Sequence, residues 1–376
     1  MKLAGALAVP LAALVVVTSL EVVQSAGDAH TVREQTDLAE AAVGPLSLLS
    51  LVEDERNASA VYLLGQEENV SLPVEDRAAA RDATDDAVAD FRSQVDGRGG
   101  AVATAYAPAL DQLDALGDLR ANIDAVPADS RNLYNVDTVI TSFDGYSAIM
   151  DAFFLANKRV ALAIDDPDLR RGAELTDLSA RQTDTIARLV RDLLLSTVGG
   201  DSPDGLNSPP EIEDVARLLS QLRANEQLIV TKATGTYRPL AEALFSAEEV
   251  VKFPEIVDQA LATGKVDLDG VLTYSAGTDP KTFGYTVFRK AATAELSQTA
   301  DRLEAAATAR QRWFGVLAIF AVVLAGVVTW LVSRSITRPL RSLTLQAKDM
   351  AEHRLPDAVL DILQTPLGDD VVVPRV

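Results

Sequence analysis

The chain has 376 residues, of which 48% are hydrophobic and only 5% aromatic, and its formal net charge is −21. This mixture favours Ala- and Leu-rich helices over sheets, so an all-α protein is expected. The sequence contains no cysteine and only two histidines, His30 and His353, which excludes disulfides and thiolate sites and argues against the common zinc and Ser/His/Asp arrangements. We therefore expect no catalytic residue, no metal and no cofactor.

The first apolar segment covers residues 3–20, which are 18 residues without a charge. At about 1.5 Å of rise per residue, a helix of this length crosses a bilayer. We predict a retained transmembrane helix over residues 1–20, because the apolar run has no clear small-x-small cleavage site and continues into a helical pattern. A cleaved signal peptide is the alternative, since Lys2 precedes the run and small residues follow at 25–27.

The long segment 21–312 is predicted to be one extracytoplasmic helical domain. It holds 49 acidic and 27 basic residues, a net charge of −22, so it does not bind nucleic acid and repels anions unless a local positive site overrides the field. One short strand is predicted near 265–274. The lengths and short connections of the helices are typical of two antiparallel four-helix bundles. Apolar spacing of three and four predicts these helices over 28–65, 73–96, 100–124, 130–164, 166–198, 208–233, 238–263 and from 280 onward.

Arg56 occupies an unexpected place in the stretch EDERNASAVYLLG. Leu49, Val52, Ala60 and Leu63 stand seven before, four before, four after and seven after it, so the arginine belongs to the apolar stripe of its helix and points inward. Arginine keeps its proton on burial, and an uncompensated buried charge costs several kcal/mol, about 3–5 in measured cases. An anion is therefore expected beside Arg56.

A second arginine is placed in a similar way in the fifth predicted helix. Arg191 shares a stripe with Leu195 and Val198, and VRDLLLSTVGG reaches its closing glycine nine positions after the arginine, as ERNASAVYLLG does after Arg56. This coarse repeat divides the eight helices into two sets of four. Arg188 lies one turn before Arg191 and adds charge, but Asp184 and Asp192 nearby favour a solvated face, which makes Arg188 the weaker candidate.

Two kinds of partner fit these arginines. The first is a carboxylate of the protein, for example Glu53, three residues before Arg56, because ion-pair networks are common in acidic domains. The second is a small oxyanion, since the planar guanidinium fork matches carboxylate, nitrate or nitrite. The ligand hypothesis further expects that the polypeptide leaves both guanidinium groups without a carboxylate of their own.

A second apolar segment, residues 313–332, has 20 uncharged residues and predicts another transmembrane helix, with Trp313 and Trp330 near its ends. Three arginines follow it directly, whereas acidic residues follow the first apolar segment. The excess of basic residues places 333–376 inside the cell and the long domain outside, which predicts a two-pass protein of the plasma membrane.

The segment 333–376 opens with ITRPLRSLTLQAKDM, in which Pro339 begins a helix and Leu340, Leu343, Ala347 and Met350 are spaced like a coiled-coil seam. This stretch resembles the first helix and connector of a HAMP linker, the parallel four-helix adaptor of bacterial receptors. The chain ends at VVVPRV, where the resemblance implies a second helix, so we expect a partial HAMP segment. His353 stands in AEHRLP, which is not the setting of a phosphoacceptor histidine.

The outer domain then resembles a known family. LLSLVEDERNASAVYLLG resembles the first helix of the nitrate- and nitrite-sensing domain, and SARQTDTIARLVRDLLLSTVGG resembles its fifth helix. The resemblance implies that two four-helix bundles enclose nitrate or nitrite and that Arg56 and Arg191 clamp the anion. Where some relatives have another basic residue beside the first arginine, this chain has Asn57.

We therefore expect a transmembrane receptor that senses nitrate or nitrite and reports it through HAMP to a histidine kinase and response regulator, as in actinobacterial sensor kinases. The resemblance also implies a homodimer. The chain itself shows no ATP-binding lid and no phosphoacceptor motif, so it is not expected to be an enzyme. Two alternatives stay open: a receptor for a carboxylate, and a membrane adaptor without a ligand.

Overall fold

The computed structural model describes residues 2–64, 76–98, 100–131, 136–198, 206, 209–275 and 284–350. Within these residues every regular element is helical, which confirms the all-α prediction. The α-helices are α1 (Lys2–Val43), α2 (Pro45–Leu64), α3 (Arg77–Arg98), α4 (Gly100–Leu113), α5 (Leu116–Asp124), α6 (Val136–Ala163), α7 (Pro167–Val198), α8 (Pro209–Lys232), α9 (Arg238–Leu244), α10 (Glu248–Thr263), α11 (Leu268–Tyr274) and α12 (Gly284–Asp349). Two short 3₁₀ turns, η1 (Ala128–Ser130) and η2 (Gly235–Tyr237), complete the described elements.

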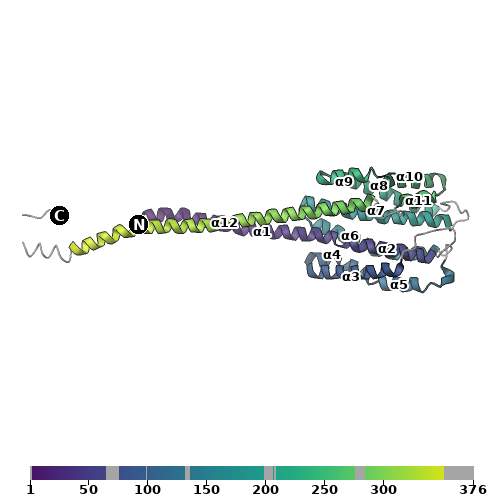
Figure 1. The fold of residues 1–376 in the computed structure, drawn as a ribbon, viewed down its shortest axis with the longest axis horizontal. Coiled ribbons are helices and arrows are strands. Elements are labelled where there is room, and N and C mark those ends of the chain that lie inside the picture. Colours follow the sequence, from purple (N-terminus) through teal and green to yellow (C-terminus); the bar gives the residue numbers. More distant parts are fainter. Residues whose placement is uncertain are drawn as a thin grey trace, which may run out of the picture. The chain divides into compact units, whose positions relative to one another are not determined.

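The first hydrophobic core lies among α2, α3, α4 and α6, which pack against one another in the order expected for a helical bundle (Figure 1). Its centre holds three aromatic rings, Phe91, Tyr106 and Phe153, with centroids 5.2 and 5.4 Å from Phe91. The Tyr106 hydroxyl lies within hydrogen-bond distance of two acceptors, Asn157 Oδ1 at 2.7 Å and the backbone carbonyl of Ala41 at 2.8 Å. Its polar end is therefore satisfied inside the core.

The second hydrophobic core lies among α7, α8, α10 and the start of α12. Tyr285 and Phe288 carry α12 into this core, and the backbone carbonyl of Tyr285 accepts a 2.7 Å hydrogen bond from Ser179 of α7. The Tyr285 hydroxyl donates to Glu226 of α8 at 2.8 Å. α7 thus joins the two cores, because α6 packs on one side of it and α8 on the other.

Three predicted helices are divided in the structure. The predicted helix 28–65 breaks between α1 and α2 because Pro45 has no amide hydrogen and its ring does not fit inside a helix; it is instead well placed as the first residue of α2. The predicted helices 100–124 and 238–263 also appear as two pieces each, α4 with α5 and α9 with α10. Gly65 and Gly200, which closed the two halves of the sequence repeat, lie outside the described residues.

The predicted strand near 265–274 is wrong, because this segment forms helix α11. Gly264 ends α10 in the left-handed conformation, with φ of 72°. Three residues later, the Asp267 side chain accepts a 3.1 Å hydrogen bond from the amide of Gly270. This N-cap starts a new helix and outweighs the strand preference of Val271 and Thr273.

The contacts divide the chain into two compact units, residues 30–306 and residues 1–29 with 307–376. Among the described residues two helices are long and apolar enough to cross a bilayer, α6 and the Gly284–Leu331 part of α12. Over half of the α6 window is buried, as in a core helix, but only 6% of the α12 window is. The predicted first span lies in α1, where most side chains are outside the described residues, as is the predicted connector from 351 onward.

Candidate site around Arg56 and Arg191

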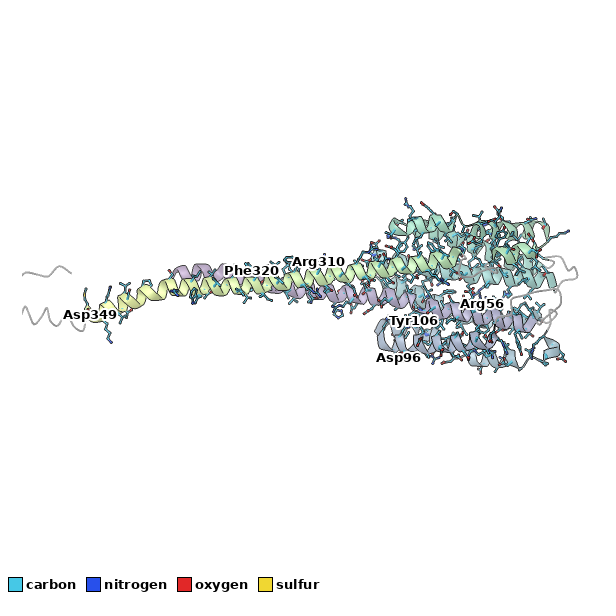
Figure 2. The ribbon with its side chains drawn as sticks, in the orientation of Figure 1. Arg56, Asp96, Tyr106, Arg310, Phe320 and Asp349 are labelled. Carbon is cyan, nitrogen blue, oxygen red and sulfur yellow. The ribbon has the colours of Figure 1, made fainter. Side chains whose placement is uncertain are left out.

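Helix α2 places Arg56 in the interior, where 1% of the residue is exposed (Figure 2). Leu49, Val52 and Leu63 of the same stripe are also buried. This confirms the prediction that the arginine points inward. The side chain points toward α6 and α7, and its Cζ lies 4.1 Å from the ring centroid of Phe143 in α6.

The contacts of Arg56 are concentrated on one of its three nitrogens. Nη1 donates to Asp184 Oδ1 at 2.5 Å and to Ser147 Oγ at 3.2 Å, and it lies 3.5 Å from Met150 Sδ. Nε and Nη2 are buried and have no hydrogen-bond acceptor among the described residues. Glu53 Oε1 lies 3.7 Å from Nη2, which is an ion pair but too long for a hydrogen bond.

Arg191 of α7 meets Arg56 at Phe143. Its Cζ lies 4.8 Å from the ring centroid of Phe143, and the Cζ of Arg56 lies 4.1 Å from the same point. Both guanidinium groups therefore contact one aromatic ring. Two cations against one aromatic ring are held partly by its quadrupole. The structure therefore brings together the two arginines that the sequence singled out.

The expectation that both guanidinium groups lack a protein carboxylate is wrong. Arg56 pairs with Asp184, and Arg191 pairs with Asp144 at 2.5 Å and with Asp192 at 2.7 Å. The sequence could not show the first and second of these pairs, because they join helices that are far apart in the chain. Of the two arginines, only Arg56 keeps buried donors without an acceptor.

Arg188 also belongs to the cluster, and the prediction of a solvated face there is wrong for Asp184. Asp184 is 4% exposed, and its carboxylate joins Arg56 through Oδ1 to Arg188 through Oδ2, at 2.5 and 2.8 Å. Arg188 also donates to Asp151 of α6 at 2.9 Å. A planar group with two oxygens thus already sits between two guanidinium groups, which is the geometry that a small planar oxyanion requires.

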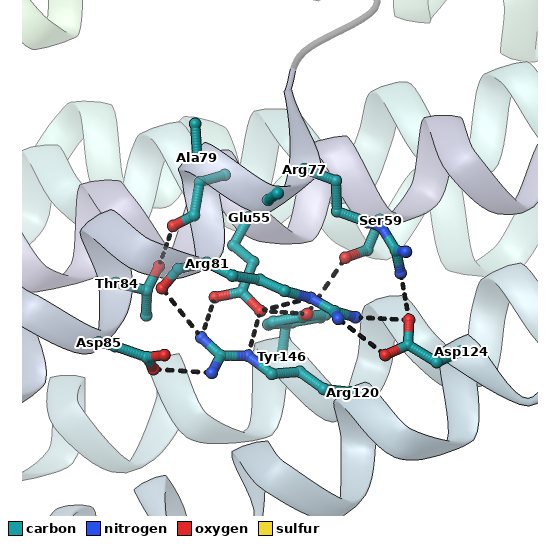
Figure 3. A network of polar contacts seen from close by, with 12 residues as sticks. Glu55, Ser59, Arg77, Ala79, Arg81, Thr84, Asp85, Arg120, Asp124 and Tyr146 are labelled. Atoms are coloured by element: carbon teal, nitrogen blue, oxygen red, sulfur yellow. Dashed lines mark hydrogen bonds and ion pairs between the residues drawn. The ribbon is translucent and has the colours of Figure 1, made fainter.

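The residue before Arg56 is held quite differently (Figure 3). Glu55 is fully buried, and Arg120 of α5 donates to both of its carboxylate oxygens at 2.7 Å. The Tyr146 hydroxyl of α6 adds a third hydrogen bond at 2.8 Å, and Arg81 of α3 stands 3.9 Å away. Around this centre, Arg77 and Arg81 both bind Asp124. Glu55 therefore ties α2 to the three other helices around it.

Titration of these carboxyls follows their contacts. Burial alone raises the pKa of Glu55, but the hydrogen bonds from Arg120 and Tyr146 outweigh it and leave the pKa below its ordinary value. Burial raises the pKa of Glu53, and the charges of Arg56 and Arg289 oppose it only in part. Burial likewise raises the pKa of Asp192 against the charge of Arg191. Glu53 and Asp192 thus take up protons more readily than Glu55.

Sequence reasoning missed the α6 residues of the cluster. Phe143, Ser147 and Met150 are spaced by four and three positions, so they form one stripe of α6. That spacing alone indicates an ordinary core face. Their relation to the arginines required the packing of α6 between α2 and α7.

The comparisons with known proteins bear on this cluster. The family model described as nitrate and nitrite sensing matches residues 47–314, which include Arg56, Phe143 and Arg191. The chain belongs to this nitrate- and nitrite-sensing family. No curated protein matches it. A solved structure titled as that of the NasR transcription antiterminator is similar with a TM-score of 0.58 and 14% identity over 86% of each chain, which shows the shared fold.

In the nitrate- and nitrite-sensing domain of this chain, the buried Arg56 and the half-buried Arg191 therefore meet at Phe143. The family match supplies the class of ligand, a small planar oxyanion. The assignment of Arg56, Arg191 and Arg188 to that ligand stays a prediction, and the geometry ranks them. Arg56 has donors to spare, whereas Arg191 and Arg188 are already paired with aspartates.

Proposed function

We propose that the chain is a transmembrane receptor that binds nitrate or nitrite between Arg56 and Arg191. The observation that carries this proposal is the buried Nε and Nη2 edge of Arg56, which finds no hydrogen-bond acceptor in the part of the chain that the structure describes. These two N–H groups point in parallel and match two oxygens of a planar anion. An anion bound there relieves the cost of leaving buried donors unpaired, about 1–3 kcal/mol.

Arg191 completes the clamp from the other bundle. All three of its nitrogens lie against Asp144 or Asp192, so an anion must exchange with one of these carboxylates. Asp144 is the easier partner to release, because its side chain is 57% exposed and returns to water. Phe143 lies against both guanidinium groups, 4.1 Å from the Cζ of Arg56 and 4.8 Å from that of Arg191.

The membrane part of the proposal rests on α12. The Gly284–Leu331 part of α12 contains an apolar stretch of which only 6% is buried, and the arginines that follow it favour the cytoplasmic side. With residues 1–20 as the first span, the sensing domain stands outside the plasma membrane. Signal would leave the domain through α12 and the HAMP-like segment toward a histidine kinase and response regulator in a homodimeric receptor. This chain would itself carry no enzymatic step.

Anion binding changes the receptor only if the anion prefers one arrangement of the helices. The two arginines lie on α2 and α7, so a shared anion favours the arrangement in which these helices bring them together. Since α12 packs on α7 through Tyr285, a small shift of α7 reaches the outgoing helix.

Calorimetric titration of the full chain in detergent with sodium nitrate and sodium nitrite tests the proposal. We expect saturable heat that Arg56→Gln abolishes or weakens at least about tenfold, a loss of 1.4 kcal/mol. Arg92→Gln is the matched control, because it removes the same charge from an exposed position on α3. Unchanged affinity in Arg56→Gln places the site elsewhere.

The alternatives give other outcomes in the same titration. A receptor for carboxylates responds to acetate more strongly than to nitrate, since acetate presents the same two oxygens to the Arg56 edge. An adaptor without a ligand gives no heat with any of these anions. Titration with sodium chloride controls for ionic strength.

A further inference from the structure

Glu53 lies between the anion cluster and the outgoing helix. It is on α2, its side chain is 18% exposed, and its Oε1 is 3.7 Å from Nη2 of Arg56. One turn earlier on α2, Ser50 accepts a 3.0 Å hydrogen bond from Nη2 of Arg289, a residue of α12. Arg289 therefore rests against the same side of α2, one turn from Glu53.

Arg289 contacts a hydroxyl where other arginines near the cluster contact a carboxylate. Arg56, Arg120 and Arg191 each pair with a carboxylate within 4 Å, whereas Arg289 donates to the Ser50 hydroxyl. Burial lowers the pKa of Arg289, and the charge of Glu53, followed by that of Asp54, opposes this shift. The charges of Arg289 and Glu53 thus interact, but the hydrogen bond of Arg289 goes to Ser50 and not to Glu53.

The Glu53 carboxylate interacts electrostatically with two cations, Arg56 and Arg289. Burial raises its pKa, and the opposing charges are, in order, Arg56 and Arg289. No hydrogen bond to the Glu53 carboxylate is present within the described part of the chain, so neither arginine holds it at close range. A carboxylate placed in this way changes partner at low cost.

We propose that Glu53 links anion binding to α12 by exchanging its partner from Arg56 to Arg289. The proposal rests on the anion site proposed above. An anion on the Nε and Nη2 edge of Arg56 occupies the cation that Glu53 now faces, and the two negative charges repel each other. Arg289 is the other cation within reach, so Glu53 turns to it and joins α2 to α12 by an ion pair.

The surroundings of Arg289 leave space for this movement. Arg289 and Ser50 line a groove of about 710 Å³ between the α1–α2 segment and α12. Small residues, among them Gly44, Ser47 and Ala294, form part of its wall. The groove therefore gives the guanidinium room to change rotamer.

Linkage makes the exchange measurable through nitrate affinity, because binding and the Glu53–Arg289 pair must favour each other. In Arg289→Gln the carboxylate has no second partner and stays against Arg56. We expect nitrate affinity to fall about fivefold, which is within the usual range of coupling between sites. In Glu53→Gln the repulsion is absent, so affinity rises.

The deciding measurement is the double variant Glu53→Gln with Arg289→Gln, titrated with nitrate by calorimetry as the full chain in detergent. If Arg289 acts through Glu53, its removal has no further effect in the Glu53→Gln background. An equal loss in both backgrounds shows that Arg289 acts on the anion directly and overturns the link. No loss in Arg289→Gln overturns it as well.

Matched controls are available at the neighbouring positions. Lys290→Gln removes the same charge from an exposed residue of the same groove and should leave affinity unchanged. Arg289→Lys keeps the charge and should restore affinity, which separates the link from a folding defect. If the unmodified chain binds neither nitrate nor nitrite, the proposed function fails together with the link. If the chain binds nitrate and Arg289→Gln does not change the affinity, only the link is contradicted.

Discussion

Glu55 and Arg56 are consecutive, buried and oppositely charged, yet their surroundings differ. Successive helical residues point about 100° apart, so Glu55 faces α5 and α6 while Arg56 faces α6 and α7. Both oxygens of Glu55 are hydrogen-bonded, whereas two of three nitrogens of Arg56 are not. A buried charge with all its partners fixes a fold, and a buried charge with partners missing has capacity left for a ligand.

The comparison predicts that replacing Glu55 mainly lowers stability and that replacing Arg56 mainly lowers nitrate affinity. Glu55→Ala leaves Arg120 without its main partner in the interior, which should lower the free energy of unfolding by about 3–5 kcal/mol. Urea unfolding of the full chain in detergent measures this loss. Saturating nitrate should not repair it, and a loss under about 1 kcal/mol would mean that the network contributes little.

Arg56→Gln should lower stability less than Glu55→Ala and should remove the response to nitrate. Asp184 keeps its bond from Arg188 when Arg56 is removed, so we expect a smaller loss of stability, about 1–2 kcal/mol for the lost charged hydrogen bonds. The rise in melting temperature that nitrate gives to the unmodified chain should disappear. The distinction between the two residues fails if this variant is as unstable as Glu55→Ala and still responds to nitrate.

Acidification sharpens the comparison further. Because burial raises the pKa of Glu53, this group favours the folded state when protonated, and that contribution is lost as the pH rises through its folded-state pKa. Protonated Glu53 also no longer repels an anion at Arg56. Nitrate affinity should therefore increase severalfold from pH 7 to about pH 5. Calorimetry at both values tests this, and Glu53→Gln should reduce the change, with the remainder from Asp192.

The smallest effect is expected at the rim of the Glu55 network. Hydrogen bonds from Arg81, and then from Arg77, lower the pKa of Asp124 to about 2, so its stabilising contribution is present above the ordinary value and is lost as the pH falls toward about 2. Its side chain is 46% exposed, so Asp124→Asn should cost no more than about 1 kcal/mol. Thermal melting at neutral pH measures this cost. Nitrate affinity should not change.

The inward position of Arg56 could be predicted from the sequence, because helical periodicity depends only on local spacing. The all-α fold could be predicted for the same reason. Asp184 and Asp144 became partners of the arginines only through packing between helices, which no single helix encodes. Glu55 was missed although it shares the stripe of Val52 and Ser59, because a glutamate beside an arginine also suits a solvated surface. The strand error near Val271 arose because β-branched residues masked the Asp267 cap.

Helices α7 and α12 pack tightly at Gly172 of α7, which lies against Tyr237 and Leu296. A methyl group on Gly172 would come within 2.8 Å of Leu296 Cδ1 and even nearer to the Tyr237 hydroxyl. Leu296 belongs to α12, so the helix that leaves the domain packs at this point against a residue without a side chain. A single added carbon would push α12 away from α7, so Gly172 sets how closely these two helices approach each other.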